Sequence, residues 1–438
     1  MEIFHEINRK MRILILSGEV WNDRINGNNV ISNWFEGMEA EFANIYCEPG
    51  VPCNKCCKKY FQITDSMMAK SIITRQKAGK ILEPTQYMLN IKAEEAPKKL
   101  YAFLKSISGD YLRIARELIW LWGRYDISQM KAFIDAFNPD VIFTERMASC
   151  KMLRLEKIVS GICNVPMLAF TGDDEYSLRQ FKFSPFYWIN RFMVRSMLRQ
   201  MVKKYKIYYT LSEEQLIEYK QLFPCEMKIL RKCGDLKKID FDIKDFERPI
   251  RIIYAGKLYM NRWKALADIA ECLKEINVNE TNMILEIYTK DNITKKQKQL
   301  LDDKKNSFIK GPVSQEVLAG IYSESDIALH VESQNRKQRL MTRLSFSTKI
   351  IDCLFSGCAV LAYCWKEQSG WSYLKREDAA ICVDSKAELI EKLKLINENP
   401  ALISEYAQKA YDCCARNHRK KKVQEMLLDD FYRVSSYV

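Results

Sequence analysis

The stretch L-S-F-S-T-K-I-I-D-C-L-F-S-G-C-A-V-L-A, from Leu344 to Ala362, decides the fold that this sequence predicts. Its polar start, with Ser347 or Thr348 as a natural N-cap, leads into apolar residues at helical spacing. Gly357 ends this predicted helix, and the apolar run 359–362 predicts a buried strand. A loop, a short helix and a buried strand in this order are typical of an α/β domain.

The start of the predicted helix has the chemistry of an anion site. Backbone N–H groups there lie beside the hydroxyls of Ser345, Ser347 and Thr348 and the ammonium group of Lys349, and together they suit a phosphate. One turn further on, the carboxylate of Asp352 can accept hydrogen bonds from a sugar diol. An ordinary capped helix explains the same residues, so the neighbouring segments are needed to choose between the two interpretations.

Strand, loop and helix alternate along most of the chain. Apolar runs such as 11–17, 166–170 and 250–256 predict buried parallel strands, with helices between them, one of them over 30–42. This alternation predicts two doubly wound α/β halves, and such sheets bind ligands at the carboxyl ends of their strands. The charged, aperiodic residues 231–249 are the expected linker.

Length and composition describe a folded protein of two or three domains. The chain has 438 residues, 47% of them hydrophobic, no run of about 20 apolar residues and no apolar core of a signal peptide. We therefore expect a cytoplasmic protein with its 15 cysteines reduced. Zinc sites usually have two separated pairs of ligands, which the spacing of Cys47, Cys53, Cys56 and Cys57 lacks, so we expect no metal.

The formal net charge of +13 implies a negatively charged partner. Residues 179–206 contain eight basic residues, no acid and many aromatic residues. Arg191, Arg195 and Arg199 recur every fourth residue, which predicts a cationic helix face suited to anionic lipid headgroups at the membrane surface. An ordinary packing helix with a solvated basic face is the alternative. No nucleic-acid-binding module accompanies the charge, so nucleic acid is not expected as a partner.

Polar residues follow several predicted strands. Lys257 and Arg262 follow the strand 250–256 in the segment G-K-L-Y-M-N-R-W, and two cations five residues apart can converge on one diphosphate. In the first half, the loop after the strand 11–17 contains Gly27, as phosphate-contacting loops do. The acids Asp173-Asp174-Glu175 follow the strand 166–170, where they suit a general base, a metal site or a solvated turn.

Together these segments resemble the family four (group 1) glycosyltransferases, which have the two-Rossmann architecture called GT-B. G-K-L-Y-M-N-R-W matches the family's G-R-L-x-x-x-K-G segment, with Lys257 in the place of its arginine and Arg262 in the place of its lysine. Asp352 stands where the second glutamate of the family's later motif binds the ribose, and S-G-C-A-V-L-A matches the strand after it. The resemblance covers most of residues 250–435 and implies an α/β GT-B fold with two Rossmann-like domains facing across a cleft.

The sequence departs from the family pattern at one acidic position. Leu344 stands where the first glutamate of the later motif is expected, and Glu332 or the turn 345–349 is expected to replace it. The domains we expect are an acceptor domain over 1–235, a nucleotide-sugar-binding domain over 236–415 and a C-terminal helix over 416–438 that can cross back to the first domain.

The resemblance implies a retaining, metal-independent glycosyltransferase without a cofactor. Its donor is a nucleotide sugar, and its acceptor is a glycan or lipid-linked saccharide. The cationic aromatic helix and the basic residues between 336 and 343 further lead us to expect an enzyme of bacterial surface polysaccharide synthesis, in the cytoplasm or at the inner face of the cell membrane. The catalytic residues that we expect are Asp173, Asp174 and Glu332. The donor-binding residues that we expect are Gly27, Lys257, Arg262, Ser345, Ser347, Thr348, Lys349 and Asp352.

Three other functions fit parts of the sequence. A nucleotide-sugar 2-epimerase of GT-B fold needs acid and base groups around the sugar, and His330 is the one histidine near a predicted strand end. A non-catalytic nucleotide-sugar-binding protein fits the loss of the first glutamate. A metal-dependent transferase using Asp173, Asp174 and Glu175 leaves the 250–362 segments unexplained. A second basic group, Arg336, Lys337, Arg339 and Arg343, suits either an acceptor diphosphate or a solvated loop.

Overall fold

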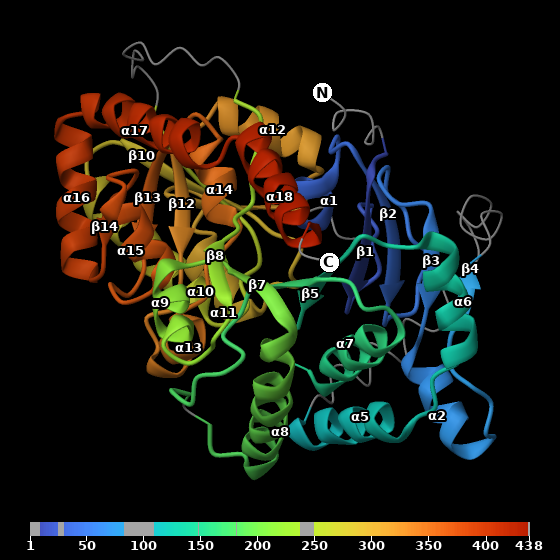
Figure 1. Cartoon of the computed structure of the whole chain (residues 1–438). Coiled ribbons are helices and arrows are strands. Elements are labelled where there is room, and N and C mark those ends of the chain that lie inside the picture. The colour runs from blue at the N-terminus through green and yellow to red at the C-terminus, as the bar shows by residue number, and fades with distance from the viewer. Residues whose placement is uncertain are drawn as a thin grey trace, which may run out of the picture. The chain divides into compact units, whose positions relative to one another are not determined.

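The computed structural model describes residues 9–24, 30–82, 109–147, 149–180, 182–236 and 249–436. The chain divides into two compact units (Figure 1). The first unit consists of Met1–Leu178, Lys182–Leu230 and Val423–Val438, and the second consists of Arg179–Phe181 and Arg231–Lys422. Each unit is built on its own sheet.

The sheet of the first unit has the strand order β4-β3-β2-β1-β5-β6-β7-β8, and every pairing is parallel except that of β3 with β4. The central strand β1 is buried at every residue except Arg12, as its continuous apolar sequence predicts. The strands are β1 (Met11–Ser17), β2 (Ala40–Tyr46), β3 (Lys59–Gln62), β4 (Lys80–Leu82), β5 (Val141–Arg146), β6 (Met167–Thr171), β7 (Tyr205–Thr210) and β8 (Glu226–Ile229).

Helices cover both faces of this sheet. On one face α5, α7 and α8 pack together (Figure 1). On the other, Phe143 of β5 packs against Phe35 of α1 and Phe431 of α18. The helices of the first unit are α1 (Val30–Phe35), α2 (Asp65–Ile73), α5 (Asp110–Trp122), α6 (Ile127–Phe137), α7 (Cys150–Ile162), α8 (Pro185–Met201), the short 3-10 helix η1 (Val202–Lys204), α9 (Glu213–Lys220) and α18 (Lys420–Ser435).

The C-terminal helix α18 is part of the first unit from Val423 onward. Asp430 accepts a hydrogen bond from the Tyr209 hydroxyl at 2.7 Å, and Gln424 donates to the backbone oxygens of Trp34 and Glu36. The aromatic contacts of Phe431 complete the packing. The last residues of the chain therefore help to cover the sheet formed by the first ones.

The second unit has a fully parallel sheet with the order β11-β10-β9-β12-β13-β14. Its strands are β9 (Ile250–Ala255), β10 (Met283–Tyr288), β11 (Ser307–Gly311), β12 (Ile327–Val331), β13 (Ala359–Tyr363) and β14 (Ile381–Val383). Its helices are α10 (Arg262–Ile276), α11 (Lys295–Leu301), α12 (Gln315–Ser323), α13 (Arg336–Thr342), α14 (Lys349–Leu354), α15 (Ser369–Arg376), α16 (Lys386–Glu398) and α17 (Ala401–Asn417).

Both sheets have a point where the chain reverses the direction in which it adds strands. It lies between β1 and β5 in the first unit and between β9 and β12 in the second. In doubly wound sheets the loops at the carboxyl ends of these two strands separate and leave room for a ligand. The topology therefore gives each unit one preferred place for a binding site.

The helix predicted over 30–42 is wrong in its second half. α1 ends at Phe35, Gly37 has a φ of +86°, and β2 begins at Ala40. Phe42 pairs in register with Ile13 of the central strand. A glycine at positive φ ends helices readily, and pairing with the central strand then determines the structure of the apolar residues that follow.

Candidate functional site

The predicted donor-binding residues of the second unit gather at its reversal point. Gly256 and Lys257 follow β9, Glu332 follows β12, and Arg262 is the first residue of α10. The backbone N–H of Gly256 donates to the oxygen of Tyr288 at 2.9 Å. Two separate loops thus bring charged groups together at one edge of the sheet.

Arg262 and Glu332 form a buried, two-pronged ion pair. The Nε of Arg262 donates to Oε2 of Glu332 at 2.9 Å, and the terminal nitrogen donates to Oε1. Only 8% of the Arg262 side chain and 5% of the Glu332 side chain are exposed. Burial opposes the charge of the guanidinium, but Glu332 raises its pKa above the usual value. Arg262 is therefore charged and held in one orientation.

Lys349 lies beside this pair and forms no ion pair of its own with a described residue. Its Nζ is buried and has no hydrogen-bond partner among the described residues. Burial, and next the charge of Arg262, lower its pKa to about 8. Burial lowers the pKa of the His330 ring to about 3, and the charges of Arg262 and Lys349 contribute to this shift. The ring is therefore neutral. A buried ammonium group beside a second cation is costly unless an anion binds there.

Gly256 makes room for the Lys349 ammonium group. A Cβ atom at position 256 would lie 2.0 Å from Nζ and 2.7 Å from Cε of Lys349. The ring of Tyr254 lies 5.4 Å from the same Nζ, and its hydroxyl donates to the backbone oxygen of Lys257 at 2.7 Å. The strand-end glycine is thus required by the close approach of the lysine.

Lys257 is exposed at the rim of this group. Its loop is held by a hydrogen bond of 2.6 Å from the backbone N–H of Leu258 to Asp291. Met260 and Asn261 have positive φ angles of 57° and 64°, and so turn the chain sharply into α10. We use the name cation cluster for Lys257, Arg262 and Lys349.

The other predicted donor residues are placed differently. Asp352 forms an ion pair with Lys232, a residue that the sequence analysis did not select. Thr348, one of the two predicted N-caps, occupies the N-cap position of α14, but its backbone is helical and its side chain makes no capping hydrogen bond. A capping hydroxyl needs extended backbone to reach the next N–H groups. The backbone oxygen of Ser345 accepts a hydrogen bond from Gln368, and that of Ser347 accepts one from Ile350. Gly27 lies outside the described residues.

The acids after β6 have three different environments in the first unit. Asp173 is exposed. Asp174 accepts hydrogen bonds from the backbone of Tyr176 and Ser177 and forms an ion pair with Arg191 at 3.3 Å. Burial raises its pKa, but Arg191 and these hydrogen bonds outweigh this and lower it. Asp174 therefore holds the turn together, and the catalytic roles of both aspartates stay predictions.

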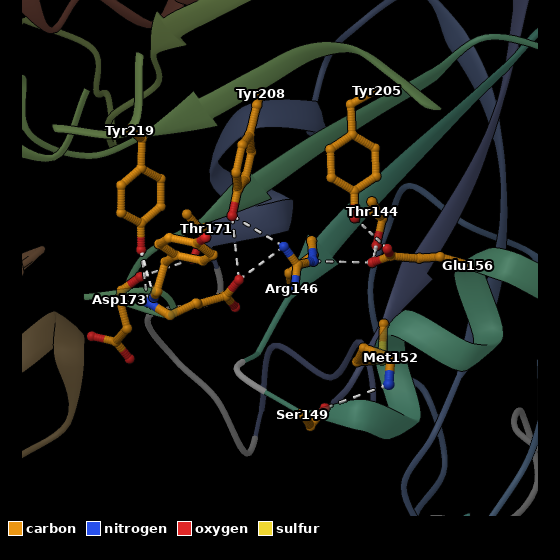
Figure 2. Close-up of polar contacts among 12 residues, drawn as sticks. Thr144, Arg146, Ser149, Met152, Glu156, Thr171, Asp173, Tyr205, Tyr208 and Tyr219 are labelled. Atoms are coloured by element: carbon orange, nitrogen blue, oxygen red, sulfur yellow. Dashed lines mark hydrogen bonds and ion pairs between the residues drawn. The ribbon is translucent and has the colours of Figure 1, made fainter. Parts of the chain in front are cut away.

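A buried ion network connects Glu175 with the sheet. Figure 2 shows Arg146 of β5 with Glu156 of α7 on one side and Tyr208 of β7 on another. Arg146 lies 2.8 Å from a Glu175 oxygen and 3.2 Å from a Glu156 oxygen, and all three side chains are fully buried. Thr144 donates to Glu156 and Tyr208 donates to Glu175. One cation thus compensates two carboxylates.

The arginines of the predicted cationic face of α8 bind acceptors in the turn 174–177. Arg191 donates to the backbone oxygens of Asp174 and Ser177 and is 6% exposed, and Arg195 donates to the oxygen of Tyr176. Arg199 donates to the Tyr176 hydroxyl. The prediction of a solvent-facing basic stripe is wrong for Arg191, which the acceptors of the 174–177 turn hold in a buried position, whereas Arg195 is partly buried and Arg199 is exposed. The predicted loop 336–343 is also wrong in part, since α13 spans Arg336–Thr342.

Two other features bear on the site. Among the described residues, no three His, Cys, Asp or Glu side chains are grouped so that they could hold a metal ion. In the same part of the chain no helix combines the length and apolar character needed to cross a membrane.

Comparisons with known proteins found a family match over part of the chain and solved structures of similar fold. Residues 284–429 match the model of a glycosyl transferase-like family. None of the curated proteins matches the sequence. The E. coli trehalose-6-phosphate structure bound with UDP-2-fluoro glucose is 9% identical in sequence, and the two structures superpose with a TM-score of 0.60. The match covers 96% of this chain and 98% of the other chain. The sucrose-phosphate synthase of Thermosynechococcus elongatus has 11% identity, 98% and 100% coverage and a TM-score of 0.59.

A third similar structure, the GtfA/B complex, is 13% identical in sequence and has a TM-score of 0.51. The match covers 72% of this chain, which spans 61% of the length of the chain it matches. These neighbours confirm the predicted GT-B fold class. Together with this fold, the family match supports a glycosyltransferase.

Proposed function

We propose that this chain is a retaining, metal-independent glycosyltransferase of the family four type. It transfers a sugar from a nucleoside diphosphate donor to a glycan or lipid-linked saccharide, in the synthesis of a bacterial surface polysaccharide. The observation that carries the proposal is the buried Lys349 ammonium group, which has no hydrogen-bond partner among the described residues and lies next to Arg262. A diphosphate supplies the anion that Lys349 lacks among the described residues, and it can also accept from the neighbouring Arg262.

The proposed chemistry follows from the charges. The bond between the anomeric carbon and the diphosphate oxygen breaks, and the acceptor oxygen forms its bond to the same face of that carbon. The acceptor proton goes to the leaving phosphate. Negative charge grows on the diphosphate in this step, and the cation cluster stabilises it in place of a metal. Glu332 holds Arg262 in orientation through its two hydrogen bonds, which is a positioning role.

Thermal shift with UDP, GDP, TDP and CMP and their sugars tests the donor assignment. We expect one nucleoside diphosphate to stabilise the folded protein by RT ln(1 + [L]/Kd) and so to raise its Tm. The rise in Tm should be the same with and without a chelator, and Lys349→Ala should abolish it. Proton NMR of the product then gives the anomeric configuration. The transferase proposal fails if the nucleotide sugar reacts without an acceptor, as an epimerase requires, or if it binds without turnover over an acceptor panel.

We also propose that the first unit binds the membrane surface through the outer face of α8. Phe183, Phe186, Ile189 and Phe192 are 87%, 46%, 49% and 56% exposed, and the ring of Tyr111 lies 6.4 Å from that of Phe186. Basic residues continue beyond this stripe, at Arg199, Lys203 and Lys204, and all three are exposed. Aromatic rings with basic neighbours suit the interface of an anionic bilayer.

Flotation with phosphatidylglycerol vesicles tests this surface. Because each exposed ring contributes apolar area to the interface, Phe186→Ser/Phe192→Ser is expected to reduce the bound fraction at least fivefold. Val278→Ser is the matched control, since Val278 is a 71% exposed apolar residue of the second unit. Equal binding by the double variant and the wild type would contradict the proposal, as would equal binding to phosphatidylcholine vesicles.

A further inference from the structure

The first unit has its own reversal point, and a carboxylate stands there. Glu145 lies near the carboxyl end of β5, directly opposite Ser17 at the end of β1 in the parallel register. Asp173 and Asp174, the acids predicted to be catalytic, follow β6, which lies one strand further from this point. Ligands of doubly wound sheets bind between the two strands where the order reverses. Glu145 is therefore better placed for a ligand than the acids after β6.

Glu145 points to the opposite face of the sheet from its two neighbours. Side chains alternate along a strand, and Thr144 and Arg146 both enter the buried network with Glu156. Glu145 shares the face of Phe143, which is covered by α1 and α18. The buried network therefore does not explain the acid at position 145, the one acid of this strand.

The Glu145 carboxylate has no hydrogen bond or ion pair with any described residue, whereas Glu156 and Glu175 in the same unit have several. Its side chain is partly buried. Burial, and next the charge of Glu19, raise its pKa to about 7. An acid kept in such a position without a partner destabilises the folded chain, and this is more typical of a binding or catalytic site than of a structural role.

We propose that Glu145 binds a hydroxyl group of the acceptor saccharide at the β1–β5 reversal point. The inference rests on the proposed transferase function, and it deepens that function by locating acceptor recognition in the first unit. A carboxylate accepts hydrogen bonds from two neighbouring hydroxyls, so a sugar diol is the ligand that fits it best. A saccharide satisfies an acid that has no partner among the described residues.

Acceptor kinetics with Glu145→Gln and Glu145→Ala test this proposal. The acceptors are p-nitrophenyl glycosides of glucose, galactose, mannose and N-acetylglucosamine, and the donor is the one found by thermal shift. We expect both variants to lower kcat/KM for the acceptor at least 20-fold while the shift of Tm by the donor nucleotide stays unchanged. Glu41→Gln is the control, because Glu41 is an exposed acid of β2, opposite Arg12 at the other end of the sheet.

The outcomes separate the two proposals. Unchanged acceptor kinetics in Glu145→Gln, with the donor shift kept, overturn the role of Glu145 and leave the transferase assignment intact. Loss of the donor shift in the wild type overturns the assignment and the inference with it. Tm gives a second check on the state of Glu145. We expect Glu145→Gln to be at least as stable as the wild type at pH 8, and a clear drop in Tm shows that the acid has a structural partner.

Discussion

Replacement of Lys349 by alanine is expected to reduce kcat by about 10²- to 10³-fold, the loss that follows when one preorganised donor group is removed from a developing anion. The ammonium group is buried beside Arg262, so its interaction with a leaving diphosphate is weakly screened. Steady-state kinetics with the donor identified by thermal shift measure the effect. Lys298→Ala is the control, since Lys298 is an exposed lysine of α11.

Gly256→Ala gives an independent version of the same test. The new Cβ meets the flexible end of Lys349, so the ammonium group has to move while the backbone can stay in place. We expect a large loss of donor affinity with a small change in Tm. If Lys349→Ala and Gly256→Ala both keep kcat within threefold of the wild type, the cation cluster does not stabilise the leaving group.

The pH dependence of the same reaction follows from the pKa of Lys349, which is about 8 in the folded chain against 10.5 for a free lysine. Only the protonated amine binds a diphosphate well, so kcat/KM for the donor should fall above pH 8. The folded state holds fewer protons than the unfolded state between pH 8 and 10.5, so the stability cost of this lysine is full below pH 8 and declines as the pH rises. Lys349→Met should therefore raise the Tm of the unliganded protein at pH 7.

Much of the second unit could be predicted from local sequence. The apolar runs of β9, β12 and β13 are buried strands as expected, and the strand-end rule locates Gly256, Lys257 and Glu332 at one edge of the sheet. The ion pair between Arg262 and Glu332 joins residues 70 positions apart. No pattern within a short window contains that contact. The sequence therefore predicted donor binding for Arg262 and catalysis for Glu332, although the two side chains form one ion pair.

The first unit shows why local periodicity was less informative there. Arg191, Arg195 and Arg199 have the spacing of a solvent-exposed helix face, but all three bind acceptors of the 174–177 turn, and Arg191 is buried against it. The aromatic residues of α8 take the outer face instead. Amphipathic spacing defines the two faces of a helix, and tertiary contacts decide which one is buried.

Replacement of Arg146 by methionine is expected to have the largest effect on stability, a loss of about 3–5 kcal/mol in the free energy of unfolding, because it leaves buried carboxylates without their cation. Glu156 and Glu175 both lie within 3.2 Å of the guanidinium, and all three side chains are fully buried. Urea denaturation at pH 7.5 measures the loss. Lys157→Met is the control, since Lys157 is an exposed basic residue of α7.

Two further measurements separate charge from packing in this network. Burial already raises the pKa of Glu156 and of Glu175, and removal of Arg146 raises both further. The folded variant then holds more protons than the unfolded chain, so its deficit should be larger at pH 8 than at pH 5. Adding Glu156→Gln and Glu175→Gln to Arg146→Met should recover most of the stability, since no buried charge is left. A deficit that is independent of pH and unchanged in the triple variant would show that Arg146 acts through its volume alone.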